Sequence, residues 1–135
     1  IDSHAQLKAL QSGGKVIAVI GGGLFNIYPK ENTKLAELIM KNGVVLSEYP
    51  PIMKPEPWHF PMRNRIISGL SRAILVVEGK QRSGTFITIQ HGLEQGKDIY
   101  AVPGSVFSEL SAGPHELIKE GAKLINHAND IIYEW

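Results

Sequence analysis

Short, unbroken apolar runs alternate with amphipathic segments along the whole chain. The runs are rich in β-branched residues and predict strands at Val16–Ile20, Val44–Ser47, Ala73–Val77 and Ile99–Val102, while Ala122–Ile125 could form a short edge strand. Each of the four longer runs is apolar throughout rather than at alternate positions. Strands of this kind are expected to be covered on both faces, which is typical of a mostly parallel sheet.

Helices are predicted between these strands. One follows Pro29 and ends at Gly43, one carries Ile66, Ile67 and Leu70, one runs from Gly84 to Gly96, one lies near His115–Glu120, and a last turn lies near Asp130. The alternation of strand and helix predicts an α/β fold with a three-layer, Rossmann-like architecture. In it, helices lie on both faces of an open, mostly parallel sheet.

Length and composition limit the classes of function. The 135 residues are expected to form one domain, 1–135, and the net charge of +1 means that any anion binding must be local. The absence of cysteine excludes disulfides and thiol catalysis and fits an intracellular, cytoplasmic protein. No apolar run approaches the roughly 20 residues of a membrane span, so no membrane partner is expected. The five histidines show no metal-ligand spacing, and no metal or cofactor is expected.

The segment Phe60–Thr88 holds the strongest candidate site, one for anions such as phosphates. Arg63-Asn64-Arg65 is expected in the first turn of a helix after Pro61, where one arginine can face the ligand edge of the sheet. A purely structural role is the alternative for both arginines. The aromatic rings of Trp58 and Phe60, which precede this helix, suit base stacking or, alternatively, a lid over the core.

Arg82-Ser83-Gly84-Thr85 follows the strand that ends at Val77. Ser83 is a candidate N-cap, Gly84 permits close approach of a ligand to the backbone N–H groups, and Thr85 could add a hydroxyl. The alternative is an ordinary capped helix in contact with solvent.

Three glycines, Gly21, Gly22 and Gly23, follow the first strand, at an edge where open α/β folds bind ligands. Their backbone could approach a phosphate closely. The glycine spacing of a dinucleotide site is missing, and a plain tight turn is the alternative.

Several motifs in order resemble the DprA (Smf) family of bacterial DNA-processing proteins. They are GGKVIAVIGGGLFNIYPKEN, VVLSEYPP, HFPMRNRIISGLSRAILVVEGKQRSGTFIT, GLEQGKDIYAVPGS and GPHELIKEGAKLI, which cover nearly the whole chain. The resemblance implies a Rossmann-like domain that binds single-stranded DNA, protects it in natural transformation and competence, and loads the recombinase RecA for DNA recombination. It also implies a homodimer without established catalytic activity, so an enzyme is not expected.

Carried over by motif, the DNA pocket is expected to involve Phe60, Arg63 and Asn64 together with Ser83, Gly84 and Thr85. Arg82 belongs to the same RSGT motif, and the turn Gly21–Gly23 is expected beside the pocket.

Two features depart from the resembled family. The chain starts at Ile1 without the family's first strand and helix and its Gly-Ser/Thr-Arg loop, so we expect a fragment of a larger fold that binds DNA more weakly than a full domain. Phe25 replaces the usual aspartate of the family's GTGLD motif, which puts any polar role at that position in doubt.

Two other functions remain open. The chain also resembles nucleoside-monophosphate phosphoribohydrolases, but Thr88 stands where their catalytic glutamate belongs, and a threonine cannot act as a carboxylate base. A nucleotide-sensing module that holds one small phosphorylated ligand is the other alternative.

Overall fold

The computed structural model describes residues 1–81 and 83–134. The chain forms two compact units, Ile1–Arg63 and Asn64–Trp135, and each is described by itself. The expectation of one domain over 1–135 therefore stays a prediction.

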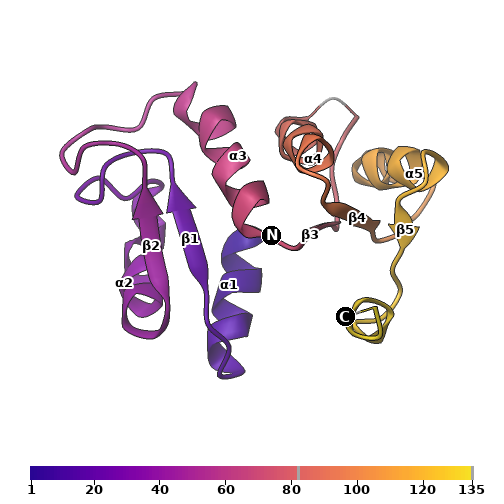
Figure 1. Ribbon diagram of the computed structural model, residues 1–135, viewed down its shortest axis with the longest axis horizontal. Helices are drawn as coiled ribbons and strands as arrows, with labels where there is room; N and C mark the ends of the chain where they lie inside the picture. Colours follow the sequence, from indigo (N-terminus) through magenta and orange to yellow (C-terminus); the bar gives the residue numbers. More distant parts are fainter. Residues whose placement is uncertain (82, 135) are drawn as a thin grey trace. The chain divides into compact units, whose positions relative to one another are not determined.

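The first unit contains a parallel two-stranded sheet and its helices (Figure 1). Its elements are α1 (Asp2–Gln11), β1 (Ile17–Ile20), the short 3-10 helix η1 (Lys30–Asn32), α2 (Thr33–Asn42), β2 (Val44–Ser47) and the beginning of α3 (His59–Leu70). The strands pair in register from Ile17 opposite Val44 to Ile20 opposite Ser47. Two parallel neighbours need a crossover connection, and α2 provides it.

The core of this unit lies between the sheet and α2. Ala36 and Ile39 of α2 are buried against Ala18 of β1 and Val45 of β2, and Ile39 is only 2% exposed. Gly43 ends the helix as predicted. A side chain at this position would not fit, because a Cβ would overlap the carbonyl oxygen of Val16.

The second unit contains a parallel three-stranded sheet. After the end of α3 come β3 (Ala73–Val76), α4 (Gly84–Glu94), β4 (Asp98–Ala101), the 3-10 helix η2 (Glu109–Ser111), α5 (Ala112–Lys119), β5 (Lys123–Leu124) and α6 (Asn129–Ile132). The strands lie in the order β3-β4-β5. Its core joins Val76 and Ala101 of the sheet to Ile89 of α4 and Leu117 of α5.

The predicted α/β class, with parallel sheets flanked by helices, is confirmed, and each predicted strand lies within two residues of an observed one. The described hydrogen bonds divide the strands into two sheets, one in each unit. The expectation that every strand is covered on both faces is wrong for Leu46 and Leu75, which are 37% and 43% exposed. In β2 the side chains alternate, so Val45 faces α2 while Leu46 points to the opposite face.

Across residues 1–81 and 83–134, no helix has both the length and the apolar character needed to cross a membrane.

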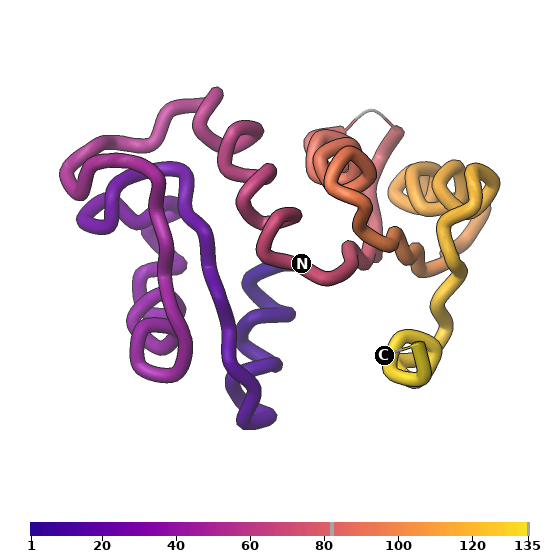
Figure 2. The backbone as a smooth tube through the Cα atoms, viewed as in Figure 1, coloured from indigo at the N-terminus to yellow at the C-terminus, as the bar shows by residue number. Residues whose placement is uncertain are grey.

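Two loops are fastened to each other at the carboxyl ends of β1 and β2. The turn Gly21–Gly23 follows β1, and the proline-rich segment 48–58 connects β2 to α3 by passing over the ends of both strands (Figure 2). The Gly23 N–H donates to the Met53 carbonyl at 2.8 Å, and the Phe25 N–H donates to the Pro51 carbonyl at 2.9 Å. Irregular backbone is thus held in place by hydrogen bonds at this edge of the sheet.

We predict that Gly23→Ala destabilises the protein by about 1–3 kcal/mol or more, the cost of overpacking a close contact. A Cβ at Gly23 would overlap the carbonyl oxygens of Pro50 and Pro51, so the proline-rich segment would have to move away and lose its hydrogen bonds. Chemical denaturation measures the change in the free energy of unfolding. Gly84→Ala is the matched control, because a Cβ at Gly84 meets no atom within 4 Å; equal stabilities of the two variants would contradict the prediction.

Candidate nucleic-acid interface

The three glycines predicted to approach a phosphate are all buried and pack against protein atoms. A Cβ at Gly21 would lie 3.1 Å from the Phe60 ring, and a Cβ at Gly22 would lie 3.1 Å from Pro55. The N–H of Gly23 already donates to Met53. Close packing of the loops therefore explains these glycines, and a contact with phosphate stays a prediction.

Phe60 and Arg63, one helical turn apart on α3, lie together in the first unit. The guanidinium carbon of Arg63 is 5.7 Å from the centre of the Phe60 ring, within the range of a cation–π contact. Its Nη1 donates a hydrogen bond of 2.5 Å to the Val19 carbonyl. Arg63 therefore joins α3 to the end of β1, which agrees with the structural role that the sequence left as an alternative. The hydrogen bond leaves the guanidinium charge in place beside the Phe60 ring.

Burial lowers the pKa of the Arg63 guanidinium, while the charges of Asp2 and Tyr49 act in the opposite direction. An arginine remains cationic at neutral pH even so. Its expected place in the first turn of the helix is corrected, because α3 begins at His59 and Arg63 lies in the second turn. Pro61 lies in the first turn of α3 and does not mark its start. A proline is tolerated there because the first N–H groups of a helix have no partner within the helix.

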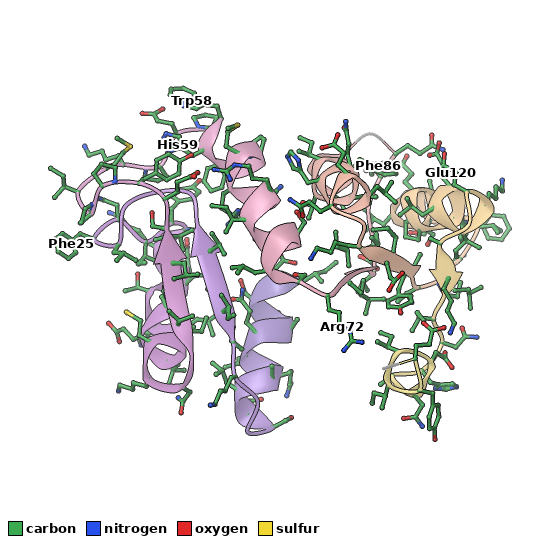
Figure 3. The ribbon with its side chains drawn as sticks, in the orientation of Figure 1. Phe25, Trp58, His59, Arg72, Phe86 and Glu120 are labelled. Carbon is green, nitrogen blue, oxygen red and sulfur yellow. The ribbon has the colours of Figure 1, made fainter. Side chains whose placement is uncertain are left out.

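His59 is a residue that the sequence analysis missed. It is 6% exposed, and its Nδ1 lies 2.8 Å from the Gly21 carbonyl oxygen. Its ring stacks on Tyr49 with the ring centres 3.9 Å apart, and Trp58 meets it edge-on at 5.6 Å (Figure 3). His59 thus connects the glycine turn, the proline-rich segment and α3. No periodic signal in the sequence marks such a role.

A cavity of about 600 Å³ lies beside these residues, also within the first unit. Its wall includes Phe25, Tyr28, Lys30 and Lys54. The sequence analysis noted Phe25 only as a departure from the resembled family and selected none of the four as a site residue. The ring centres of Tyr28 and Phe60 are 5.9 Å apart with an angle of 54° between the planes. One signal for this wall was present in the sequence: the segment Tyr28-Pro29-Lys30 places an aromatic residue beside a cation. The sequence analysis interpreted this segment only as the approach to a helix.

In the second unit, Ser83–Thr85 form the beginning of α4. Ser83 occupies the predicted N-cap position, but its side chain makes no capping hydrogen bond. Its Oγ is buried and has no hydrogen-bond partner among the described residues. Gly84 is exposed, and the first N–H groups of a helix have no partner within the helix. An anion site at this helix start stays a prediction.

The remaining predicted site residues are placed as follows. Asn64 is half-buried on α3 and belongs to the second unit. Arg82 lies outside the described residues. Phe60 and Arg63 lie in one unit and Ser83–Thr85 in the other, so the predicted pocket that would combine all of them stays a prediction.

The described residues 1–81 and 83–134 contain no group of three or more His, Asp or Glu side chains that could hold a metal ion.

Comparison with known proteins places the chain in a family. The family profile described as DNA recombination-mediator protein A matches residues 1–135. The DNA processing protein DprA of Bacillus subtilis is 50% identical over 134 residues, which are 99% of this chain and 45% of that protein. The chain thus spans about half the length of the curated relatives it matches.

Solved structures agree with this result. The crystal structure of DprA from Streptococcus pneumoniae superposes with a TM-score of 0.92 at 49% identity, over 100% of this chain and 48% of that one. DprA from Helicobacter pylori, known for its single-stranded DNA binding mode, superposes with a TM-score of 0.82 at 22% identity, over 98% of this chain and 70% of that one. The second likeness shows the Rossmann-like fold alone. The chain therefore belongs to the DNA recombination-mediator protein A family, to which DprA and Smf proteins belong.

Proposed function

We propose that this protein binds single-stranded DNA through two sets of contacts, one in each unit. The observation that carries the proposal is the cavity of about 600 Å³ in the first unit, whose wall combines two aromatic rings with two lysines. Within the described part of the chain, no aspartate or glutamate belongs to this wall. Aromatic faces stack on bases of any sequence and cations hold the phosphates, which is how sequence-tolerant binders of single strands work.

In the first unit, the tilted pair of Tyr28 and Phe60 offers aromatic surface to a base. Lys30 and Lys54 are exposed and can reach phosphates on either side of it. Arg63 adds a third positive charge at the Phe60 ring. The Phe60 ring packs against Gly21 and Tyr28, so little of its side-chain entropy would be lost on binding.

In the second unit, the start of α4 offers a different kind of anion site. Gly84 is exposed, and a helix start offers N–H groups without a partner within the helix, which favours a phosphate oxygen. The Oγ of Ser83, which finds no partner among the described residues, is a further candidate donor.

The wider role that we propose follows the family. The protein would protect incoming single strands in the cytoplasm, bring them to a RecA-type recombinase during natural transformation, and act as a homodimer without catalysing a reaction. The family description as a recombination mediator and the 50% identity to a DNA processing protein support this proposal. Thr88 stands where the phosphoribohydrolases carry a glutamate, which supports the proposal that the protein catalyses no hydrolysis.

A titration of this chain with a fluorescently labelled thymine oligomer tests the proposal. Binding should strengthen with oligomer length and weaken with salt, because released counterions drive it. Saturable binding of a single nucleotide that longer oligomers do not exceed would overturn the proposal and favour a nucleotide-sensing module.

We predict that Lys30→Ala and Lys54→Ala each weaken binding of the oligomer and flatten its salt dependence. For single strands the slope of log affinity against log salt changes by about 0.7 for each lost phosphate contact. Fluorescence anisotropy at several salt concentrations measures the slope. Lys8→Ala is the matched control, since Lys8 is an exposed lysine of α1 outside the cavity wall. Slopes equal to that of the parent for both variants would remove these lysines from the interface.

We predict that Gly84→Pro weakens binding of the oligomer roughly tenfold, the loss expected for one hydrogen bond to a charged group. Proline at the first helical position removes one N–H and is compatible with the helix. The preceding Ser83 is already extended, with φ −76° and ψ 170°, as a residue before proline prefers.

Gly84→Ala is the matched control for this variant, because it keeps the N–H and meets no neighbouring atom. Unfolding curves of both variants verify that α4 remains intact. If Gly84→Pro binds the oligomer as tightly as Gly84→Ala, the start of α4 does not hold a phosphate through this N–H.

A further inference from the structure

The tips of the two fastened loops expose apolar side chains that the core does not use. Phe25 and Ile52 are 78% and 77% exposed, and neither belongs to the core cluster of the first unit. Figure 3 shows the Phe25 ring pointing outward from its loop. Single exposed apolar side chains are common on protein surfaces, but Phe25 also belongs to the wall of the cavity.

The backbone beneath these side chains is fixed rather than free. The Phe25 N–H donates to the Pro51 carbonyl at 2.9 Å, the Asn26 side-chain amide donates to the Ile52 carbonyl at 2.9 Å, and the Asn26 N–H donates to the Gly23 carbonyl at 2.8 Å. The backbone that carries the Phe25 ring is therefore held in place by these hydrogen bonds. A rigid aromatic group loses little conformational entropy when it binds.

The chemistry around Phe25 indicates what it binds. Phe25 and Lys54 contribute to the wall of the same cavity, which also holds Tyr28 and Lys30 and, among residues 1–81 and 83–134, no carboxylate. A flat apolar face beside a cation matches a nucleobase and its phosphate. A protein partner of ordinary composition carries no defined acidic group opposite the two lysines beside the apolar tip. It therefore matches this surface less well than a nucleotide does.

We propose that Phe25 is a stacking platform for one base, and Lys54 the phosphate contact, of an outer nucleotide subsite at the loop tips. The subsite lengthens the path of the strand beyond Tyr28 and Phe60, so the first unit holds at least one nucleotide more than its inner aromatic pair requires. The inference rests on the proposed binding of single-stranded DNA, which is argued from the same cavity wall, and it specifies the base contact that Phe25 makes there.

The test compares Phe25→Ala with the parent chain in titrations with two oligomers of equal length. One is a thymine oligomer, and the other has the same sugar–phosphate backbone without bases. Phe25→Ala should weaken binding of the thymine oligomer roughly 5- to 100-fold, the range for one lost stacking contact. It should leave binding of the baseless oligomer unchanged, which a general disturbance of the loops would not do.

Phe107→Ala is the matched control, since Phe107 is a phenylalanine that is 96% exposed in the second unit. Its affinity for the thymine oligomer should equal that of the parent. Phe25→Trp provides a second readout: the added indole should retain the affinity, and its fluorescence should be quenched by the thymine oligomer more than that of the parent.

The outcomes separate this inference from the proposed function. If the parent binds the thymine oligomer and Phe25→Ala binds it equally well, the outer subsite is overturned while the proposed function stands. Equal losses for both oligomers would assign Phe25 to the support of the loops and would also overturn the subsite. If the parent binds no oligomer, both the proposed function and the subsite fail.

Discussion

The close approach of the Gly21–Gly23 turn to the proline-rich segment is the constraint on which the first unit's surface depends. The Gly23 N–H meets the Met53 carbonyl, and the carbonyl oxygens of Pro50 and Pro51 occupy the place where any side chain on Gly23 would stand. This contact places Lys54, from the segment after β2, at the same cavity as Tyr28 and Lys30, from the segment after β1. Without this contact, the two loops that carry Lys30 and Lys54 would not be held at one cavity.

The sequence predicted the regular elements well because their signal is local. A run such as Val44–Ser47 forms the observed strand β2 with the same bounds, and glycines mark the ends of α2 and α4 as expected. The cavity could not be predicted in the same way. Most of its residues, such as Tyr28 and Lys54, come from irregular backbone, where no period links them. The hydrogen bonds that join the two loops are mainly between backbone carbonyl and N–H groups, which leave no pattern in the side chains.

Arg63 shows how a structural and a binding role can coexist. A half-buried guanidinium must satisfy its N–H groups, and the Val19 carbonyl at the end of β1 accepts from one of them. Because the guanidinium is planar, it can also lie over the Phe60 ring while remaining charged. The two roles that the sequence left as alternatives for Arg63 are therefore compatible. Its fixed position keeps the charge beside the ring without an entropic cost on binding.

The near-zero net charge of the chain suits a local interface. Fourteen lysine and arginine residues stand against thirteen aspartate and glutamate residues, so no attraction for polyanions arises from the molecule as a whole. Among the described residues, the cavity wall nevertheless holds two lysines and no carboxylate, so a local positive charge faces the cavity. Phe25 adds an uncharged aromatic face to this wall. Under the proposed function, a few fixed contacts would set the affinity for a strand, through stacked bases as well as neutralised phosphates.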